Sequence, residues 1–177
     1  YTLLNCSLYH FPVLALGKLL NITSLSLSRN PFTTIDEHSF YISSILTYLD
    51  LSFTALHTIG TLTFYNCSKL RILNLLFTKL SLITPEMFTG LEQLQSLSLS
   101  NIPMSIQNVR DVYIFSMFTT LSELYVPHFE MCCMVHDIKC ISDNNKKAVF
   151  STCSNIIDSI VLSVMLHTFA IMCGFAN

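Results

Sequence analysis

Four cysteines lie close together in the sequence of this chain: Cys132, Cys133, Cys140 and Cys153. Thiols this close together either oxidise to disulfides or bind a soft metal ion, for which His136 adds a further ligand. Four cysteines allow three pairings, and the sequence alone does not choose among them. An oxidising compartment favours disulfides, so we expect two disulfides and no metal. We favour Cys132–Cys140, whose short loop closes easily, together with Cys133–Cys153.

Three Asn-x-Ser/Thr triplets are acceptors for N-linked glycans in a secreted or membrane protein, at Asn5, Asn21 and Asn66. Asn21 and Asn66 fall outside the expected strands, where a glycan leaves the binding face open. Asn5 lies one residue before Cys6, which we expect to be a buried free thiol. We predict glycosylation at these positions.

No set of residues in the chain resembles a catalytic site. The histidines, including His57 and His128, lie apart from any nucleophile or paired carboxylate. The formal net charge is −2, which favours neither nucleic acid nor an anionic surface as a partner. The sequence therefore predicts a protein that is not an enzyme and holds no cofactor.

The structural units that carry these residues repeat along the chain. Leucine recurs every 24 positions, at Leu25, Leu49, Leu73 and Leu97. Several other apolar positions keep the same step: Ile22, Leu46, Leu70 and Leu94; Leu27, Leu51, Leu75 and Leu99; Ile35, Ile59 and Ile83; Phe40, Phe64 and Phe88. The form L-x-x-L-x-L-x-x-N-x-L at this period is the leucine-rich-repeat signature. It predicts an α/β fold, a leucine-rich-repeat solenoid with a parallel concave sheet.

The same register extends toward both ends of the chain. Counting back by 24 gives Leu3, Cys6, Leu8 and Phe11. We therefore expect the chain to open inside a repeat, with no start methionine, signal peptide or N-terminal cap. A step of 27 leads forward to Leu121, Leu124, Val126 and Phe115, which predicts an insertion of three residues within 105–113. Five and a half repeats result, more than the roughly three needed for a continuous core.

Side chains alternate along a strand, so residues beside the inward leucines point to the concave face. This face is predicted to carry Ser24, Ser26, Ser28, Tyr48, Asp50, Ser52, Ile72, Asn74, Leu76, Ser96, Ser98, Ser100, Glu123 and Tyr125. The candidates for ligand contact are its larger polar and charged members, Tyr48, Asp50, Asn74, Glu123 and Tyr125. The position after each strand prefers asparagine, and here it is Cys6, Asn30, Thr54, Thr78 and Ile102. A threonine there bonds less fully and Ile102 not at all.

Residues 159–176 contain no Asp, Glu, Lys or Arg. A helix that crosses a bilayer needs about 20 apolar residues, so we predict a transmembrane helix that begins near Ile156. The alternative is an amphipathic helix that caps the solenoid, but the segment shows no polar stripe. The predicted domains are repeats over 1–129, a cysteine-rich cap over 130–155 and a first transmembrane helix over 156–177.

The run from Met117 to Cys132 resembles the juncture in leucine-rich-repeat-containing G-protein-coupled receptors, most closely those of relaxin-receptor type. Its Met-Phe-x-x-Leu-x-x-Leu stretch and the later Phe129 and Cys132 match that family's pattern, and Cys140 matches a further family cysteine. The adjacent pair Cys132 and Cys133 is similar to the double cysteine of glycoprotein-hormone receptors. Asn177 falls where rhodopsin-like receptors carry a Gly-Asn motif, with Ala176 in place of the glycine.

The resemblance implies a plasma-membrane receptor with extracellular repeats, which binds a peptide or protein hormone and signals through heterotrimeric G proteins. In relaxin-type receptors, acidic and apolar residues of the concave face receive basic residues of the hormone. Here only Asp50 and Glu123 are acidic among the predicted concave positions, so this chain departs from that pattern. The alternative is a single-pass leucine-rich-repeat receptor or cell-adhesion protein, which shares the solenoid, the cap and one membrane helix.

Overall fold

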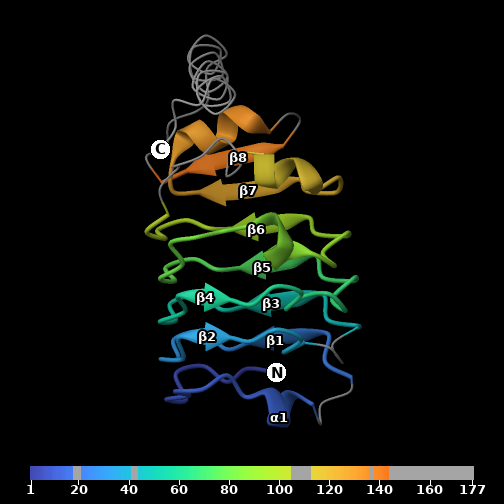
Figure 1. The fold of residues 1–177 in the computed structure, drawn as a ribbon, viewed down its shortest axis with the longest axis vertical. Coiled ribbons are helices and arrows are strands. Elements are labelled where there is room, and N and C mark those ends of the chain that lie inside the picture. The colour runs from blue at the N-terminus through green and yellow to red at the C-terminus, as the bar shows by residue number, and fades with distance from the viewer. Residues whose placement is uncertain (18–20, 41–43, 105–112, 136–137, 144–177) are drawn as a thin grey trace, which may run out of the picture.

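A computed structural model describes residues 1–17, 21–40, 44–104, 113–135 and 138–143 of the 177-residue chain. The described residues form a solenoid whose turns stack one on the next in sequence order (Figure 1). The predicted transmembrane helix over 156–177 lies outside them. Within the part that the structure describes, no helix combines the length and apolar character needed to cross a bilayer.

One parallel sheet runs the length of the stack. Its strands, in spatial order, are β1 (Ser24–Ser26), β3 (Tyr48–Asp50), β5 (Ile72–Asn74), β6 (Ser96–Ser98), β7 (Glu123–Val126) and β8 (Lys139–Ser142). Thr2 adds an isolated parallel bridge to Ser26 before the first strand. Five of these strands are those predicted from the period. The sixth, β8, lies within the segment predicted as a cysteine-rich cap.

The register of the sheet reproduces the period of the sequence. Leu49 pairs with Leu73, and Leu73 pairs with Leu97. Leu97 then pairs with Leu124, which confirms that the step lengthens to 27 at that point. The insertion invoked for the longer step falls largely on residues 105–112, outside the described residues. All of these leucines are fully buried, so the inward row of each strand is continuous from turn to turn.

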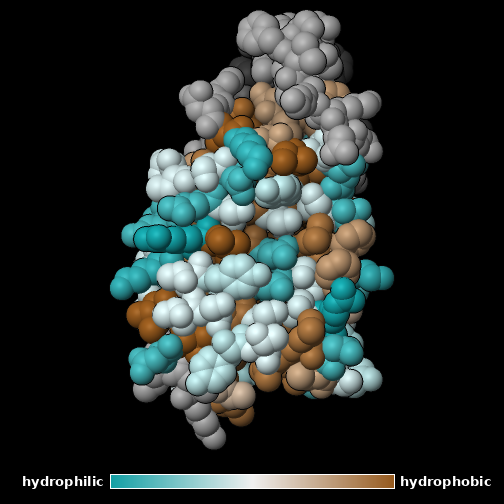
Figure 2. All heavy atoms as spheres, turned by 180° about the vertical axis from the view of Figure 1, so that it is seen from behind, coloured by the Kyte–Doolittle hydropathy of each residue, from teal (hydrophilic) through white to brown (hydrophobic). Residues whose placement is uncertain are grey.

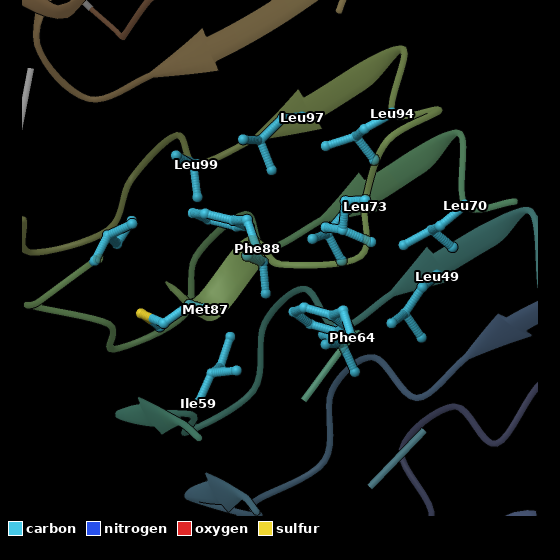
Figure 3. Close-up of a cluster of buried hydrophobic side chains, with 14 of the residues drawn as sticks. Leu49, Ile59, Phe64, Leu70, Leu73, Met87, Phe88, Leu94, Leu97 and Leu99 are labelled. Carbon is cyan, nitrogen blue, oxygen red and sulfur yellow. The ribbon is translucent and has the colours of Figure 1, made fainter. Parts of the chain in front are cut away.

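Short elements close the convex side of the core. They are α1 (Val13–Leu16), the two-stranded parallel sheet of β2 (Thr34–Ile35) and β4 (Thr58–Ile59), and the 3-10 helices η1 (Pro85–Phe88), η2 (Tyr113–Met117) and η3 (Phe129–Met134). The repeated phenylalanines are buried on this side of the core: Phe40, Phe64, Phe88 of η1 and Phe115 of η2. Figure 3 shows Phe64 and Phe88 facing the leucines of the main strands across the core. The 3-10 helix η1 begins at Pro85, with Thr84 as its N-cap residue.

The first turn of the stack is only partly covered. Leu3, Leu8 and Phe11 pack against the core as the back-counted register predicts, but they are half-buried. Cys6, expected to be buried, is an exposed free cysteine. The physical reason is that Cys6 has a neighbouring turn on one side only among the described residues. By contrast, Cys67 is a fully buried free cysteine, and burial raises the pKa of its thiol to about 12.

The side chain at the asparagine position after each strand determines how many hydrogen bonds join neighbouring turns. The buried Asn30 accepts hydrogen bonds from the backbone N–H groups of Cys6 and Leu8, at 2.9 and 3.1 Å. Its amide nitrogen donates to the carbonyl oxygens of Leu3 and Leu27, at 2.7 and 2.8 Å. One side chain thus joins two turns. The other turns lack this full set of bonds because they carry cysteine, threonine or isoleucine there.

The two threonines at this position differ in a way that predicts opposite responses to substitution. Thr54 donates to the carbonyl oxygen of Leu51 at 2.8 Å, whereas the buried hydroxyl of Thr78 has no partner. A buried unpaired hydroxyl costs about 1–3 kcal/mol. We expect Thr78→Val to raise the free energy of unfolding by about 1 kcal/mol, and Thr54→Val to lower it by about the same. Urea titrations of the full chain measure the free energy of unfolding of both variants. If both substitutions changed it in the same direction, the difference in hydrogen bonding between Thr54 and Thr78 would be contradicted.

Candidate ligand-binding face

The concave face presents two adjacent rows of outward side chains, because the parallel register places equivalent residues side by side. One row contains Tyr48, Ile72, Ser96, Glu123 and Lys139. The other contains Asp50, Asn74, Ser98, Tyr125 and Ile141. All five residues predicted from the sequence to contact a ligand therefore lie in two neighbouring rows of one sheet.

An open hollow of about 330 Å³ lies on this face. Its lining comes from four neighbouring strands and the residues just after them: Tyr48, Ile72, Leu73, Asn74, Leu76, Ser96, Ser98, Ser100 and Tyr125. The serines of β6 are small, and they lie between the larger side chains of β5 and β7, so the face is hollowed there. Tyr48, Asn74 and Tyr125 border the hollow directly, while Asp50 and Glu123 pair with strand residues that line it.

Asp50 is held in place by neighbours on the same face. The hydroxyl of Ser26 donates to its Oδ2 at 3.0 Å, and the N–H of Ser52 donates to its Oδ1 at 3.0 Å. Burial, and after it the negative charge of Asp50, raises the pKa of the Tyr48 hydroxyl. Tyr48 therefore remains a neutral donor at physiological pH. No ion pair to Asp50 occurs within the described residues, so its charge is available to a ligand.

Glu123 has a partner that the sequence did not reveal. The ammonium of Lys139 lies 2.8 Å from its Oε1, and the hydroxyl of Tyr125 donates to its Oε2 at 3.3 Å. The hydrogen bond from Lys139, and next the charge of Lys139, hold the pKa of Glu123 below its usual range. Glu123 thus stays ionised at neutral pH, but its charge is balanced within the protein. Of the two predicted acidic residues, only Asp50 offers an uncompensated charge.

The cysteine cluster forms a disulfide at its centre. Cys132 and Cys140 are bonded with an S–S distance of 2.03 Å, the pairing favoured from the sequence. Cys133 is also disulfide-bonded, while Cys153 and His136 lie outside the described residues, so the pairing Cys133–Cys153 stays a prediction. Cys140 occupies the inward position of β8 beside Leu124. The bond therefore ties η3 to the last strand of the sheet.

The predicted acceptor sites Asn5, Asn21 and Asn66 are all exposed. Asn21 and Asn66 lie outside every strand, as expected. Asn5 borders a second hollow beside the concave sheet. Among residues the structure describes, no three histidine, cysteine or acidic side chains gather closely enough to hold a metal ion.

Comparison with known proteins identifies the repeat. The sequence profile described as Leucine rich repeat matches residues 44–101. No curated protein matches the chain. A structure titled as a TLR13–ssRNA13 complex is similar with a TM-score of 0.57 and 25% identity, over 60% of this chain and 15% of that one. An internalin (inlF) from Listeria monocytogenes gives a TM-score of 0.60 and 20% identity, over 78% of this chain and 39% of that one.

Together these comparisons show leucine-rich repeats in a parallel-sheet solenoid. The chain spans about 15% and 39% of the two similar structures. The internalin likeness shows the fold alone, because its identity is low. The repeats themselves are the common feature, and stacked repeats of this kind create extended concave surfaces that bind other molecules.

Proposed function

We propose that this chain is the ligand-binding part of a cell-surface receptor, in which the concave sheet binds a peptide or protein hormone. The observation that carries the proposal is the hollow between Tyr48 and Tyr125, with the unpaired charge of Asp50 beside it. Tyrosine supplies a large, rigid contact area and a hydrogen-bonding tip, which is typical of residues that dominate protein interfaces. The protein acts by binding and is not an enzyme.

The finer proposal is a rhodopsin-like G-protein-coupled receptor of the relaxin-receptor or glycoprotein-hormone-receptor kind. The resemblance of residues 117–132 to that family supports it, as does the uncharged run over 159–176. On this proposal the repeats lie outside the cell, the run enters the plasma membrane, and heterotrimeric G proteins couple to transmembrane helices beyond this chain. A single-pass receptor or adhesion protein is the alternative.

Charge on the concave face narrows the class of ligand. Because Lys139 already neutralises Glu123, a basic side chain of the ligand is best received by Asp50. Apolar side chains of the ligand then fit the part of the hollow formed by Ile72 and Leu76. The structure titled TLR13–ssRNA13 pairs a similar solenoid with RNA. For this chain we propose a protein ligand, because the exposed charge beside the hollow is negative.

The test displays the full chain on mammalian cells and measures binding of labelled relaxin-like and glycoprotein hormones. We expect Tyr48→Ala and Asp50→Asn each to weaken binding by about tenfold or more, the usual loss for an interface hot spot. Tyr65→Ala is the matched control, since Tyr65 is 57% exposed and lies outside the main sheet. Lys139→Gln should strengthen binding of a basic hormone, because it frees Glu123. Equal losses at Tyr65 and Tyr48, or stronger binding of single-stranded RNA, would reject the proposal.

A further inference from the structure

A row of residues with left-handed backbone follows the strands of the main sheet. Asn5, Arg29, Phe53, Phe77 and Asn101 recur every 24 residues, and their φ angles lie between 53° and 59°. The stack imposes this conformation: the N–H of Phe53 donates to the carbonyl oxygen of Leu76, and that of Phe77 to Ser100, at 2.8 and 3.1 Å. Each turn therefore continues its hydrogen bonding to the next turn just past the strand.

This backbone conformation favours glycine and asparagine and disfavours large side chains. The two outer members of the row, Asn5 and Asn101, follow that preference. Phe53 and Phe77 go against it, and burial does not explain them, since they are 41% and 47% exposed. Neither the backbone nor the core accounts for phenylalanine at these positions, which points to a role at the surface.

The three central side chains form an ordered stack, which we call the Arg–Phe ladder: Arg29, Phe53 and Phe77. The two rings are stacked with centroids 4.8 Å apart and planes 19° apart. The guanidinium carbon of Arg29 lies 4.7 Å from the centroid of the Phe53 ring. Because the turns follow one another along the stack (Figure 1), the turn of Phe53 lies between the turns that carry Arg29 and Phe77. Both rings remain partly exposed to solvent.

The ladder borders an open hollow of about 580 Å³ beside the concave sheet. Arg29 and Lys79 both line this hollow, and no acidic residue does. Neither cation takes part in an ion pair within the described residues. The hollow therefore combines apolar ring edges with two uncompensated positive charges. On the face seen in Figure 2, which views the molecule from behind relative to Figure 1, apolar and polar residues are mixed without one continuous apolar patch.

We propose that the Arg–Phe ladder and Lys79 form a second binding surface, which takes an extended acidic segment of a partner protein. Apolar side chains of that segment pack on the edges of Phe53 and Phe77, while its carboxylates pair with Arg29 and Lys79. This surface is distinct from the concave hollow, and it does not depend on the hormone-receptor proposal. It lies at the ends of the strands rather than on their outward faces.

The geometry favours an acidic peptide over single-stranded nucleic acid. Proteins that bind single strands stack bases on free aromatic faces. In the ladder the Phe53 ring is already in contact with Arg29 on one neighbouring turn and with Phe77 on the other, so a base cannot stack on Phe53 without displacing one of them. Ring edges carry a partial positive charge, which suits carboxylates and carbonyl oxygens. The experiment must therefore distinguish binding of an acidic peptide from binding of single-stranded nucleic acid.

The experiment measures binding of fluorescent peptides to the full chain displayed on cells. The probe is a peptide of about ten residues in which leucine and phenylalanine alternate with glutamate, and its control carries lysine in place of glutamate. Asn5, a predicted glycan acceptor, borders the hollow, so the peptides are measured on the parent chain and on Ser7→Ala, which removes the acceptor sequence of Asn5. We expect the glutamate peptide to bind at least about tenfold more tightly than the lysine peptide.

The decisive variant is Phe53→Asn with Phe77→Asn. Asparagine tolerates the left-handed backbone, so this double variant should fold with the circular-dichroism spectrum and unfolding temperature of the parent chain, and lose at least about tenfold in affinity for the glutamate peptide. Arg29→Gln with Lys79→Gln leaves the rings in place and should weaken binding and its dependence on salt. Asp50→Asn should leave peptide binding unchanged. Equal binding of both peptides, unchanged binding by both double variants, or displacement by a single-stranded oligonucleotide would overturn the proposal.

Discussion

Replacing Leu73 with alanine is expected to lower the free energy of unfolding by about 2–5 kcal/mol, the usual cost of truncating a buried leucine. Leu73 is fully buried, and its register partners Leu49 and Leu97 lie on either side of it. The turns above and below are fixed by backbone hydrogen bonds, so they cannot close over the cavity. A urea titration of the full chain, followed by far-ultraviolet circular dichroism, measures the effect.

Ile72→Ala is the matched control for this change. Ile72 is the adjacent residue of β5, points to the concave face and is 40% exposed. Its truncation removes similar atoms but opens no enclosed cavity, so we expect a loss of about 1 kcal/mol or less. If both substitutions cost the same, the two sides of the strand would not differ in burial, and the assignment of the inward row would be wrong.

Gly90→Ala is expected to be at least as damaging, with a loss of about 3 kcal/mol or more, since it combines backbone strain with overpacking. Gly90 has a φ of +98°, which a side chain rarely tolerates. A β-carbon there would lie 2.4 Å from the carbonyl oxygen of Phe64 and 2.5 Å from that of Tyr65. Both contacts are with backbone of the preceding turn, so relief would require two turns to separate.

Gly17→Ala provides the comparison for Gly90. Gly17 follows α1 with φ −57° and ψ −20°, a conformation open to any residue. Alanine there restricts the unfolded chain without straining the folded one, so a small gain of about 0.5 kcal/mol is expected. Circular dichroism during thermal unfolding measures both variants. A Gly90→Ala protein that unfolds at the same temperature as the parent would contradict the close approach of the two turns.

The period of the sequence predicts the first strands of the sheet but not the last one. From Leu25 to Leu97 the inward residues recur at a constant step, so the strands could be placed from the sequence. Leu124 still follows, after a step of 27. The inward residue of β8 is Cys140, only 16 positions beyond its partner Leu124. No repeat pattern signals that step, which is why β8, and with it the pairing of Lys139 with Glu123, was missed.

Side-chain environment was less predictable than register. The concave positions of Tyr48, Asn74 and Tyr125 follow from strand alternation, but the hollow between them depends on the depth left by the serines of β6. The burial of Cys6 was wrongly inferred from its place in the repeat. That inference assumed neighbours on both sides, while Cys6 lies in the first turn of the described stack.

The sequence by itself determined the repeat, the parallel sheet, the inward leucines and phenylalanines, and the five residues of the candidate binding face. It did so because a fixed period and strand alternation are local properties of the chain. Only the tertiary structure decided that Glu123 is neutralised by Lys139, and that Arg29, Phe53 and Phe77 form an exposed stack. These features depend on distances between turns and on the backbone conformation past each strand, which residue spacing alone does not specify.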